Sequence, residues 1–91
     1  MTNADIFDAG APWQLNSQVS LRDEAFGALA YHHGTRRLVF LKSRELVALV
    51  RELADFDCAT DALRALVPDD QYERYVAALT SLYSSEILSA R

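Results

Sequence analysis

The sequence contains only one cysteine, Cys58, in 91 residues. A single thiol cannot form an intrachain disulfide, and it cannot build a zinc site made of several thiolates. A catalytic thiolate needs a neighbouring base, and the sequence assigns none to Cys58. We therefore interpret Cys58 as a small side chain of the protein interior.

Basic residues are in the minority, with 9 Lys and Arg against 13 Asp and Glu, so the net charge is −4. A protein that binds DNA or RNA needs a cationic face to replace the counterions around the phosphates. The overall charge therefore argues against a nucleic-acid partner. It remains compatible with a local basic patch that attracts an acidic peptide.

The sequence has no apolar run that approaches the roughly 18 to 20 residues needed to span a bilayer. Its first ten residues, MTNADIFDAG, lack a basic region followed by an apolar run, so we expect no secretory signal. Together with the lone cysteine, this predicts a reduced, soluble, cytoplasmic protein without a membrane partner.

Motifs for catalysis and cofactor binding are missing as well. No glycine-rich phosphate loop occurs, and no serine has the flanking glycines of a nucleophile elbow. His32 and His33 are adjacent, so in an extended segment they point to opposite faces and cannot bind one metal ion together. We expect neither enzymatic activity nor a metal or cofactor held by this chain.

Apolar residues, in contrast, make up 51% of the sequence, which is enough for one packed core. A chain of this length has one such core at most. Residues 1–11 contain small and acidic residues and are predicted to form a flexible N-terminal arm. Residues 12–91 are predicted to form a single folded domain.

Three segments have the patterns of β-strands. Residues 17–22 alternate between polar and apolar, and residues 26–32 are almost continuously apolar, as is typical of a central strand. Gly34 supplies a turn, and residues 36–42 return as a strand rich in β-branched and aromatic side chains. These segments predict a three-stranded antiparallel meander with its third strand at an edge.

After Lys42 the apolar residues follow the period of a helix. Ser43 is a suitable N-cap, because its hydroxyl can accept a backbone N–H of the first turn. The apolar face of this helix is formed by Leu46, Leu49, Val50 and Leu53. A second, short helix is predicted over residues 60–67, with Thr60 as its cap.

Pro68 separates the second helix from a long third helix, which Asp69 or Asp70 caps. The apolar stripe of this third helix is predicted to extend to Ile87 and Leu88. The predicted fold is therefore α+β, in the order βββααα. A meander followed by three helices is the order of a winged helix-turn-helix variant.

The predicted third strand is the leading candidate for a binding site, because both of its faces are apolar and cations bracket it. One explanation is a strand covered by helices on both faces. The other is an exposed edge that captures an extended peptide through main-chain hydrogen bonds. The candidate peptide-binding residues are Arg36, Arg37, Leu38, Val39, Phe40, Leu41 and Lys42.

The third helix supplies a second set of candidates, Tyr72, Tyr75, Val76, Leu79 and Tyr83. Tyrosines on one stripe can line the core with their hydroxyls at the surface. They can equally form the rim of a site for an apolar peptide. The sequence leaves both explanations open.

Two motifs resemble a known family, R-x-E-x-F-G-A-L-x-Y at residues 22–31 and T-R-R-L-x-F-L-K at residues 35–42. In combination they resemble the mycofactocin biosynthesis peptide chaperones. These belong to the precursor-peptide recognition element family, together with the chaperone of pyrroloquinoline quinone biosynthesis. The resemblance covers residues 12 to 67. Asp23 and Ala25 stand where proline is expected in many relatives, a difference that affects loop stiffness.

The resemblance implies a chaperone that binds the leader of a ribosomally synthesised precursor peptide and delivers it to a radical S-adenosylmethionine maturase. It further implies that the leader adds to the third strand and packs against the third helix. The iron–sulfur chemistry would belong to the maturase, because one cysteine cannot hold a cluster. An acidic leader is expected, which suits the cations Arg36, Arg37, Lys42 and Arg44.

Two functions of other classes remain as alternatives. A winged-helix DNA-binding regulator needs a basic recognition helix, whereas the third helix here opens with Asp69, Asp70 and Glu73. A structural subunit could instead pair its exposed edge strand with a second copy, which would give a homodimer.

Overall fold

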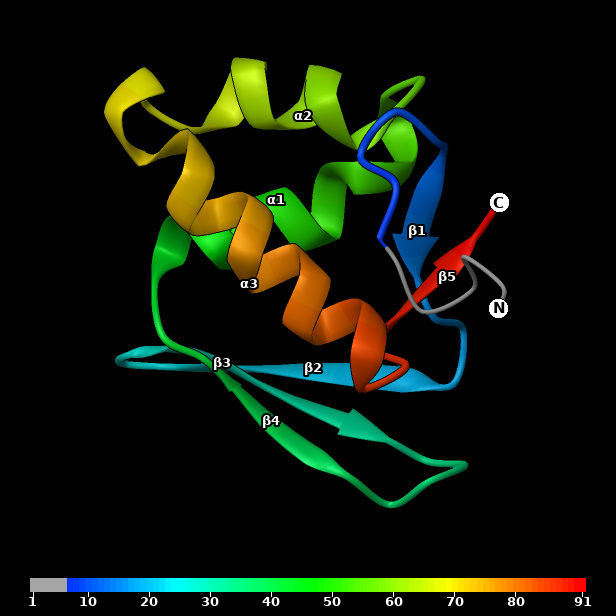
Figure 1. Cartoon of the computed structure of the whole chain (residues 1–91). Coiled ribbons are helices and arrows are strands. Elements are labelled where there is room, and N and C mark those ends of the chain that lie inside the picture. The colour runs from blue at the N-terminus through cyan, green and yellow to red at the C-terminus, as the bar shows by residue number, and fades with distance from the viewer. Residues whose placement is uncertain (1–6) are drawn as a thin grey trace.

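Two antiparallel sheets and three α-helices form the fold of the computed structural model, which describes residues 7–91 (Figure 1). The three-stranded sheet consists of β2 (Val19–Glu24), β3 (Gly27–His32) and β4 (Leu38–Leu41). The two-stranded sheet pairs β1 (Trp13–Leu15) with β5 (Leu88–Ala90). The helices are α1 (Arg44–Glu52), α2 (Ala59–Leu66) and α3 (Tyr72–Ser84), and 3₁₀ turns cover Leu53–Asp55 and Asp69–Gln71. Within residues 7–91, no helix has the length and apolarity needed to cross a bilayer.

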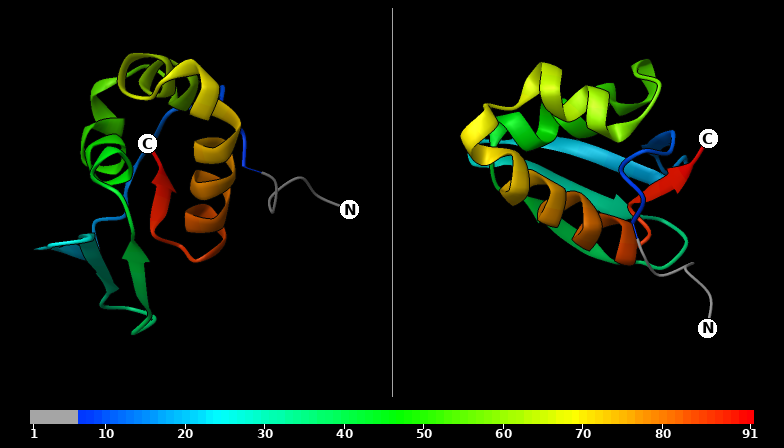
Figure 2. Two further views of the ribbon diagram at one scale, coloured as in Figure 1. Left: turned by 90° about the vertical axis from the view of Figure 1, so that its left-hand side faces the viewer. Right: turned by 45° about the horizontal axis from the view of Figure 1, so that its top comes forward.

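The three-stranded sheet confirms the meander that the sequence predicts, and the fold is α+β as expected. Its strand order is β2-β3-β4, with β3 antiparallel to both neighbours, so β4 lies at an edge. The helices lie on one side of this sheet (Figures 1 and 2). The other side is therefore left without a covering layer.

The predicted order βββααα is wrong, because β1 precedes the meander and β5 follows the third helix. Helix α3 ends at Ser84, and Glu86 then adopts a φ of 63° that turns the chain back. Leu88, predicted on the helix, instead pairs with Leu15 in the two-stranded sheet. Two apolar residues beyond a helix can extend its stripe or begin a strand, and periodicity alone does not distinguish them. The winged helix-turn-helix likeness stays a prediction.

Of the three helix caps that the sequence predicts, the structure confirms one. Ser43 Oγ accepts the Leu46 N–H at 3.0 Å and caps α1, as predicted. Helix α2 begins at Ala59, one residue before the predicted cap Thr60. Neither Asp69 nor Asp70 caps α3, because both lie in the 3₁₀ turn before it. Pro68 does separate the two helices.

The described part of the predicted N-terminal arm, residues 7–11, packs against the domain. Phe7 is buried, and the carbonyl oxygen of Ala9 accepts both the backbone N–H and the hydroxyl of Thr60. Residues 1–6 of the predicted arm lie outside the described residues. Cys58, predicted to be interior, is only half-buried.

The core lies between the helices and the inner face of the three-stranded sheet. On the sheet it is formed by small side chains of β3 and by Leu41 of β4, and α1 packs directly against β3. Small residues allow the helix backbone to approach the strands closely. The fully buried members of this core include Ala28, Ala30, Leu41, Leu49, Val50, Leu53, Leu63 and Leu79.

Gly27 opens β3 directly after a two-residue turn and has a φ of +147°. Side chains rarely adopt this conformation. A Cβ at this position would lie 2.0 Å from the carbonyl oxygen of Leu41, which is backbone and cannot rotate away. Glycine is therefore required where the β2–β3 turn meets the end of β4.

We predict that Gly27→Ala lowers the free energy of unfolding by about 1–3 kcal/mol, because the backbone conformation of Gly27 and the nearby Leu41 carbonyl both exclude a methyl group. Urea unfolding followed by circular dichroism measures this. Gly10→Ala is the matched control, because a Cβ there meets only the flexible Asp8 side chain, at 3.2 Å. Equal stability of the two variants would show that the Gly27 backbone can relax.

Candidate functional site

The turn between β3 and β4 contains a one-residue bulge at Arg36, whose φ is 65°. Arg36 N–H donates to the His32 carbonyl at 2.7 Å, and His32 N–H donates to the Arg37 carbonyl at 2.9 Å. Two residues thus oppose His32, which is the geometry of a bulge. The predicted strand over residues 36–42 is consequently shortened to Leu38–Leu41, and the two arginines are exposed in the turn.

His32 stabilises this turn from inside the protein. Its side chain is 4% exposed, and its Nδ1 accepts the backbone N–H groups of Gly34 and Thr35, both at 3.0 Å. His33 points outward, and its ring lies 2.7 Å from Ser20 Oγ. The two side chains thus point to opposite faces, as predicted, with His32 at the end of β3 and His33 in the turn. Among residues 7–91, no group of three metal-ligating side chains gathers anywhere.

The register of the hairpin identifies the unpaired backbone groups of β4. Hydrogen-bonded and non-hydrogen-bonded pairs alternate along an antiparallel ladder. His32 and Arg37 form a hydrogen-bonded pair, so the next such pairs are Ala30 with Val39 and Ala28 with Leu41. The N–H and C=O groups of the intervening residues, Leu38 and Phe40, therefore point away from β3 to the open edge.

A groove begins at the end of β4, where the first turn of α1 faces α3. Two adjoining hollows share Ser43, Arg74 and Tyr75, and the Ser43 hydroxyl lies 2.9 Å from the Tyr75 hydroxyl. Figure 2 shows α3 running along the β4 side of the sheet. The residues that line the hollow nearest to β4 are Lys42, Ser43, Leu46, Arg74, Tyr75 and Ala78.

Cations lie at both ends of β4 and on the facing helix. Within residues 7–91, ion pairs form only between Arg22 and Glu24 and between Arg51 and Asp23. Within these residues, the positive charges of the turn, of Lys42 and of Arg74 thus form no ion pair, and Glu45 is the one carboxylate that lines a hollow of the groove together with Arg74. An acidic segment lying along β4 would meet cations at each end.

The structure separates the predicted residues of β4 by face. Val39 and Leu41 point to the helices, Val39 half-buried and Leu41 fully buried, so Leu41 has no side-chain surface to offer. Leu38 and Phe40 point to the uncovered side of the sheet and are 58% and 59% exposed. Lys42 follows the strand and contributes to the groove.

On α3, the structure brings Tyr75 to the groove and directs the other predicted residues elsewhere. Leu79 is fully buried, and Tyr72 and Val76 are half-buried against the core. Tyr83 lies near the far end of the helix, where its ring packs against Trp13 with centroids 5.1 Å apart. The tyrosine stripe therefore marks mainly the core-facing side of α3.

Sequence reasoning missed four residues that line the hollow nearest to β4, Ser43, Leu46, Arg74 and Ala78. Ser43 and Leu46 were assigned only to a cap and a core face. Arg74 and Ala78 lie four residues apart, so they share one side of the helix, and Tyr75 lies three residues before Ala78 and borders that side. That spacing was the available signal, but nothing local indicates that this side faces β4.

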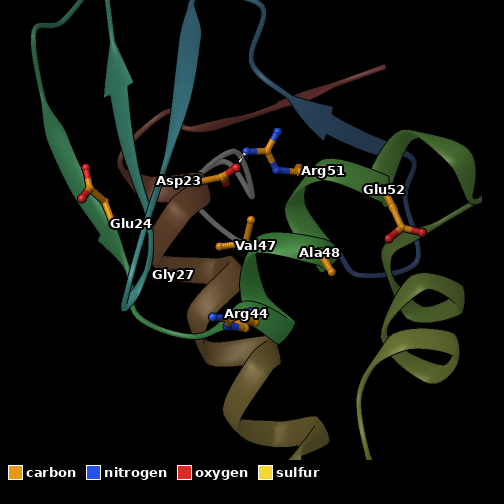
Figure 3. Close-up of a pocket in the computed structure, with 8 residues that line it drawn as sticks. All are labelled: Asp23, Glu24, Gly27, Arg44, Val47, Ala48, Arg51 and Glu52. Carbon is orange, nitrogen blue, oxygen red and sulfur yellow. Dashed lines mark hydrogen bonds and ion pairs between the residues drawn. The ribbon is translucent and has the colours of Figure 1, made fainter.

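A second depression, drawn in Figure 3, lies between the β2–β3 hairpin and α1. Arg51 Nη2 and Asp23 Oδ1 form an ion pair there, 2.8 Å apart. Such an exposed pair contributes at most about 1 kcal/mol. This ion pair joins α1 to β2, so we interpret the depression as a contact between helix and hairpin. Its residues are Asp23, Glu24, Gly27, Arg44, Val47, Ala48, Arg51 and Glu52.

Comparisons with known proteins agree on one family. The family model described as "Peptide chaperone MftB family" matches residues 12–89. A protein named "Peptide chaperone MftB" from Mycobacterium ulcerans is 46% identical over 86 residues, which cover 93% of this chain and 79% of the relative. A protein of the same name from Mycolicibacterium smegmatis is 49% identical over 83 residues, 90% of this chain and 81% of the relative. No solved structure matches with comparable significance.

These matches confirm the resemblance noted for residues 12 to 67. They also extend it through α3 and into β5, because the family model ends at residue 89. The residues that line the groove, on the first turn of α1 and on α3, thus lie within the matched region.

We predict that His32→Phe lowers the free energy of unfolding by about 1–3 kcal/mol, because the ring keeps its bulk while the backbone N–H groups of Gly34 and Thr35 lose their buried acceptor. Urea unfolding measures the loss, and amide hydrogen exchange should show faster exchange in residues 34–41. His33→Phe, the matched control at the exposed neighbour, is expected to change stability by less than about 0.5 kcal/mol. A stable His32→Phe would mean that the turn holds without the imidazole.

Proposed function

This chain belongs to the peptide chaperone MftB family, and from that membership we propose that it binds the leader of a ribosomally synthesised precursor peptide. It then presents the peptide to a radical S-adenosylmethionine maturase during mycofactocin biosynthesis. The chain itself performs no chemistry in this proposal. The similar proteins are named peptide chaperones, which supports a binding role over an enzymatic one.

The observation that carries this proposal is the open edge of β4. Leu38 and Phe40 direct backbone N–H and C=O groups outward, which is what an incoming strand requires. A leader added here gains main-chain hydrogen bonds that do not depend on its sequence. Its alternate side chains then point towards the helices or towards the uncovered side of the sheet.

Specificity in this proposal comes from the groove that begins at the end of β4, between the first turn of α1 and α3. Leu46 and Ala78 supply apolar surface for a leader side chain, and Lys42 and Arg74 supply charge for acidic ones. The arginines of the β3–β4 turn attract carboxylates at the other end. The contact is small, so we expect an affinity on the order of micromolar to tens of nanomolar.

The chaperone acts by raising the concentration of its peptide at the maturase. One cysteine cannot ligate an iron–sulfur cluster, so the cluster belongs to the partner enzyme. We place this activity in the cytoplasm, where ribosomal precursor peptides are made. The winged helix-turn-helix likeness of the fold is kept as part of the proposal.

We predict that Phe40→Pro weakens binding of a synthetic leader peptide at least about tenfold, because it removes an outward N–H donor. Proline is tolerated at this position, where the missing N–H faces solvent at an edge. Val39→Pro, the obvious choice from sequence alone, would instead break the ladder with β3. Titration calorimetry measures the affinity.

Phe40→Ala is the matched control, because it removes the same ring and keeps the N–H. It should change leader affinity by less than about threefold. Circular dichroism checks that both variants are folded. If the alanine and proline variants bind the leader equally well, the backbone edge of β4 is not the binding element.

We predict that Arg74→Glu weakens leader binding at least about fivefold at low ionic strength, because it reverses a charge in the groove. The difference from the unchanged protein should shrink between about 50 mM and 500 mM NaCl, since salt screens exposed charges. Arg64→Glu on α2 applies the same charge change to an exposed side chain that does not line the groove. Equal effects of both variants would indicate a response to net charge only.

A further inference from the structure

The outer side of the three-stranded sheet carries a cluster of apolar side chains that no element covers. We call Phe26, Leu29, Tyr31, Leu38 and Phe40 the outer patch. Leu38 lies opposite Tyr31 and Phe40 lies opposite Leu29 in the β3–β4 register, so the four share one face. Phe26, in the β2–β3 turn, packs edge-on against Phe40 with ring centroids 5.7 Å apart.

The exposure of this patch is not explained by the fold. Phe26, Leu38 and Phe40 are 45%, 58% and 59% exposed, and they are the large apolar side chains exposed within residues 7–91. Phe26, Phe40 and Lys42 line a hollow of about 380 Å³ on this side. Single exposed apolar residues are common, but contiguous ones usually mark an interaction surface.

The patch is bordered by positive charge. Arg22 lies opposite Leu29 on β2, Lys42 extends from β4, and Arg36 and Arg37 lie in the turn before Leu38. These are four of the 9 Lys and Arg side chains of a chain whose net charge is −4. Glu24 pairs with Arg22 and leaves the other three without a carboxylate partner in residues 7–91. The complementary surface is therefore apolar at its centre and acidic at its rim.

An added peptide strand does not account for the whole patch. Neighbouring strands lie about 4.8 Å apart, so a strand paired to β4 lies about 10 Å from β3. Phe26, which is exposed, and the half-buried Leu29 and Tyr31 would therefore stay uncovered after the leader had bound. A second copy of this chain fits poorly too, because a symmetric contact would bring like charges of both rims together.

We infer that the outer patch docks a folded protein, the radical S-adenosylmethionine maturase, through an apolar surface rimmed by carboxylates. The identity of this partner rests on the proposed function. The leader pairs with the edge of β4, and the maturase covers the face of the same strand. Phe40 thus contributes backbone to one partner and side chain to the other, so both can be bound at once.

The test uses Phe26→Asp and Tyr31→Thr with purified maturase and synthetic leader in separate titrations. Phe26 lies in a turn and Thr suits a strand, so both variants should fold. We expect each to weaken maturase binding at least about tenfold while leader affinity changes less than about twofold. Ala65→Asp, an exposed site on α2 at the other end of the molecule from the sheet, is the matched control and should leave both affinities unchanged (Figure 1).

Several results would overturn this inference. One is unchanged maturase binding by both patch variants, and another is no maturase binding by the unchanged protein. A concentration-dependent dimer that Phe26→Asp abolishes would assign the patch to a second copy. Failure of the unchanged protein to bind the leader would instead refute the proposed function, so the two failures are distinguishable.

Discussion

The hydrogen-bonding register between β3 and β4 is the constraint on which the candidate binding surface depends. Backbone and side-chain directions alternate along a strand, so a slip of one residue would exchange the inner and outer faces of β4. His32 and the bulge at Arg36 hold the register from within the turn. In this register Leu41 reaches the core, while Leu38 and Phe40 present side chains to one open face and backbone groups to the open edge.

Helix α3, which lines one side of the groove, is held in place at both of its ends. Near the start of α3, the hydroxyl of Tyr75 meets that of Ser43, which also caps α1. Near its end, Tyr83 packs against Phe7 and Trp13, and the chain then turns back to pair β5 with β1. The small second sheet and the N-terminal segment thus contribute to the site without lining it. They fix the position of the helix that faces β4.

Local patterns predicted the main elements correctly, because alternation and helical periodicity are properties of neighbouring residues. The three strands, the three helices and the cap at Ser43 could be read this way. Strands β1 and β5 could not, since each has three residues and they pair from opposite ends of the chain. The candidate strand lies at a sheet edge, as its pattern predicts, whereas the tyrosine stripe marks mainly the core side of α3. The lining residues Arg74 and Ala78 lie on its adjacent side.

The sequence by itself determined that residues 36–42 contain an apolar strand flanked by cations, that motifs for catalysis are missing, and which family the chain resembles. These conclusions need only residue identity and spacing. The tertiary structure alone decided which backbone groups of β4 are unpaired, which of its faces is covered, and which side of α3 lies opposite. Each of these depends on a pairing or packing partner distant in the sequence, and no local pattern records that partner.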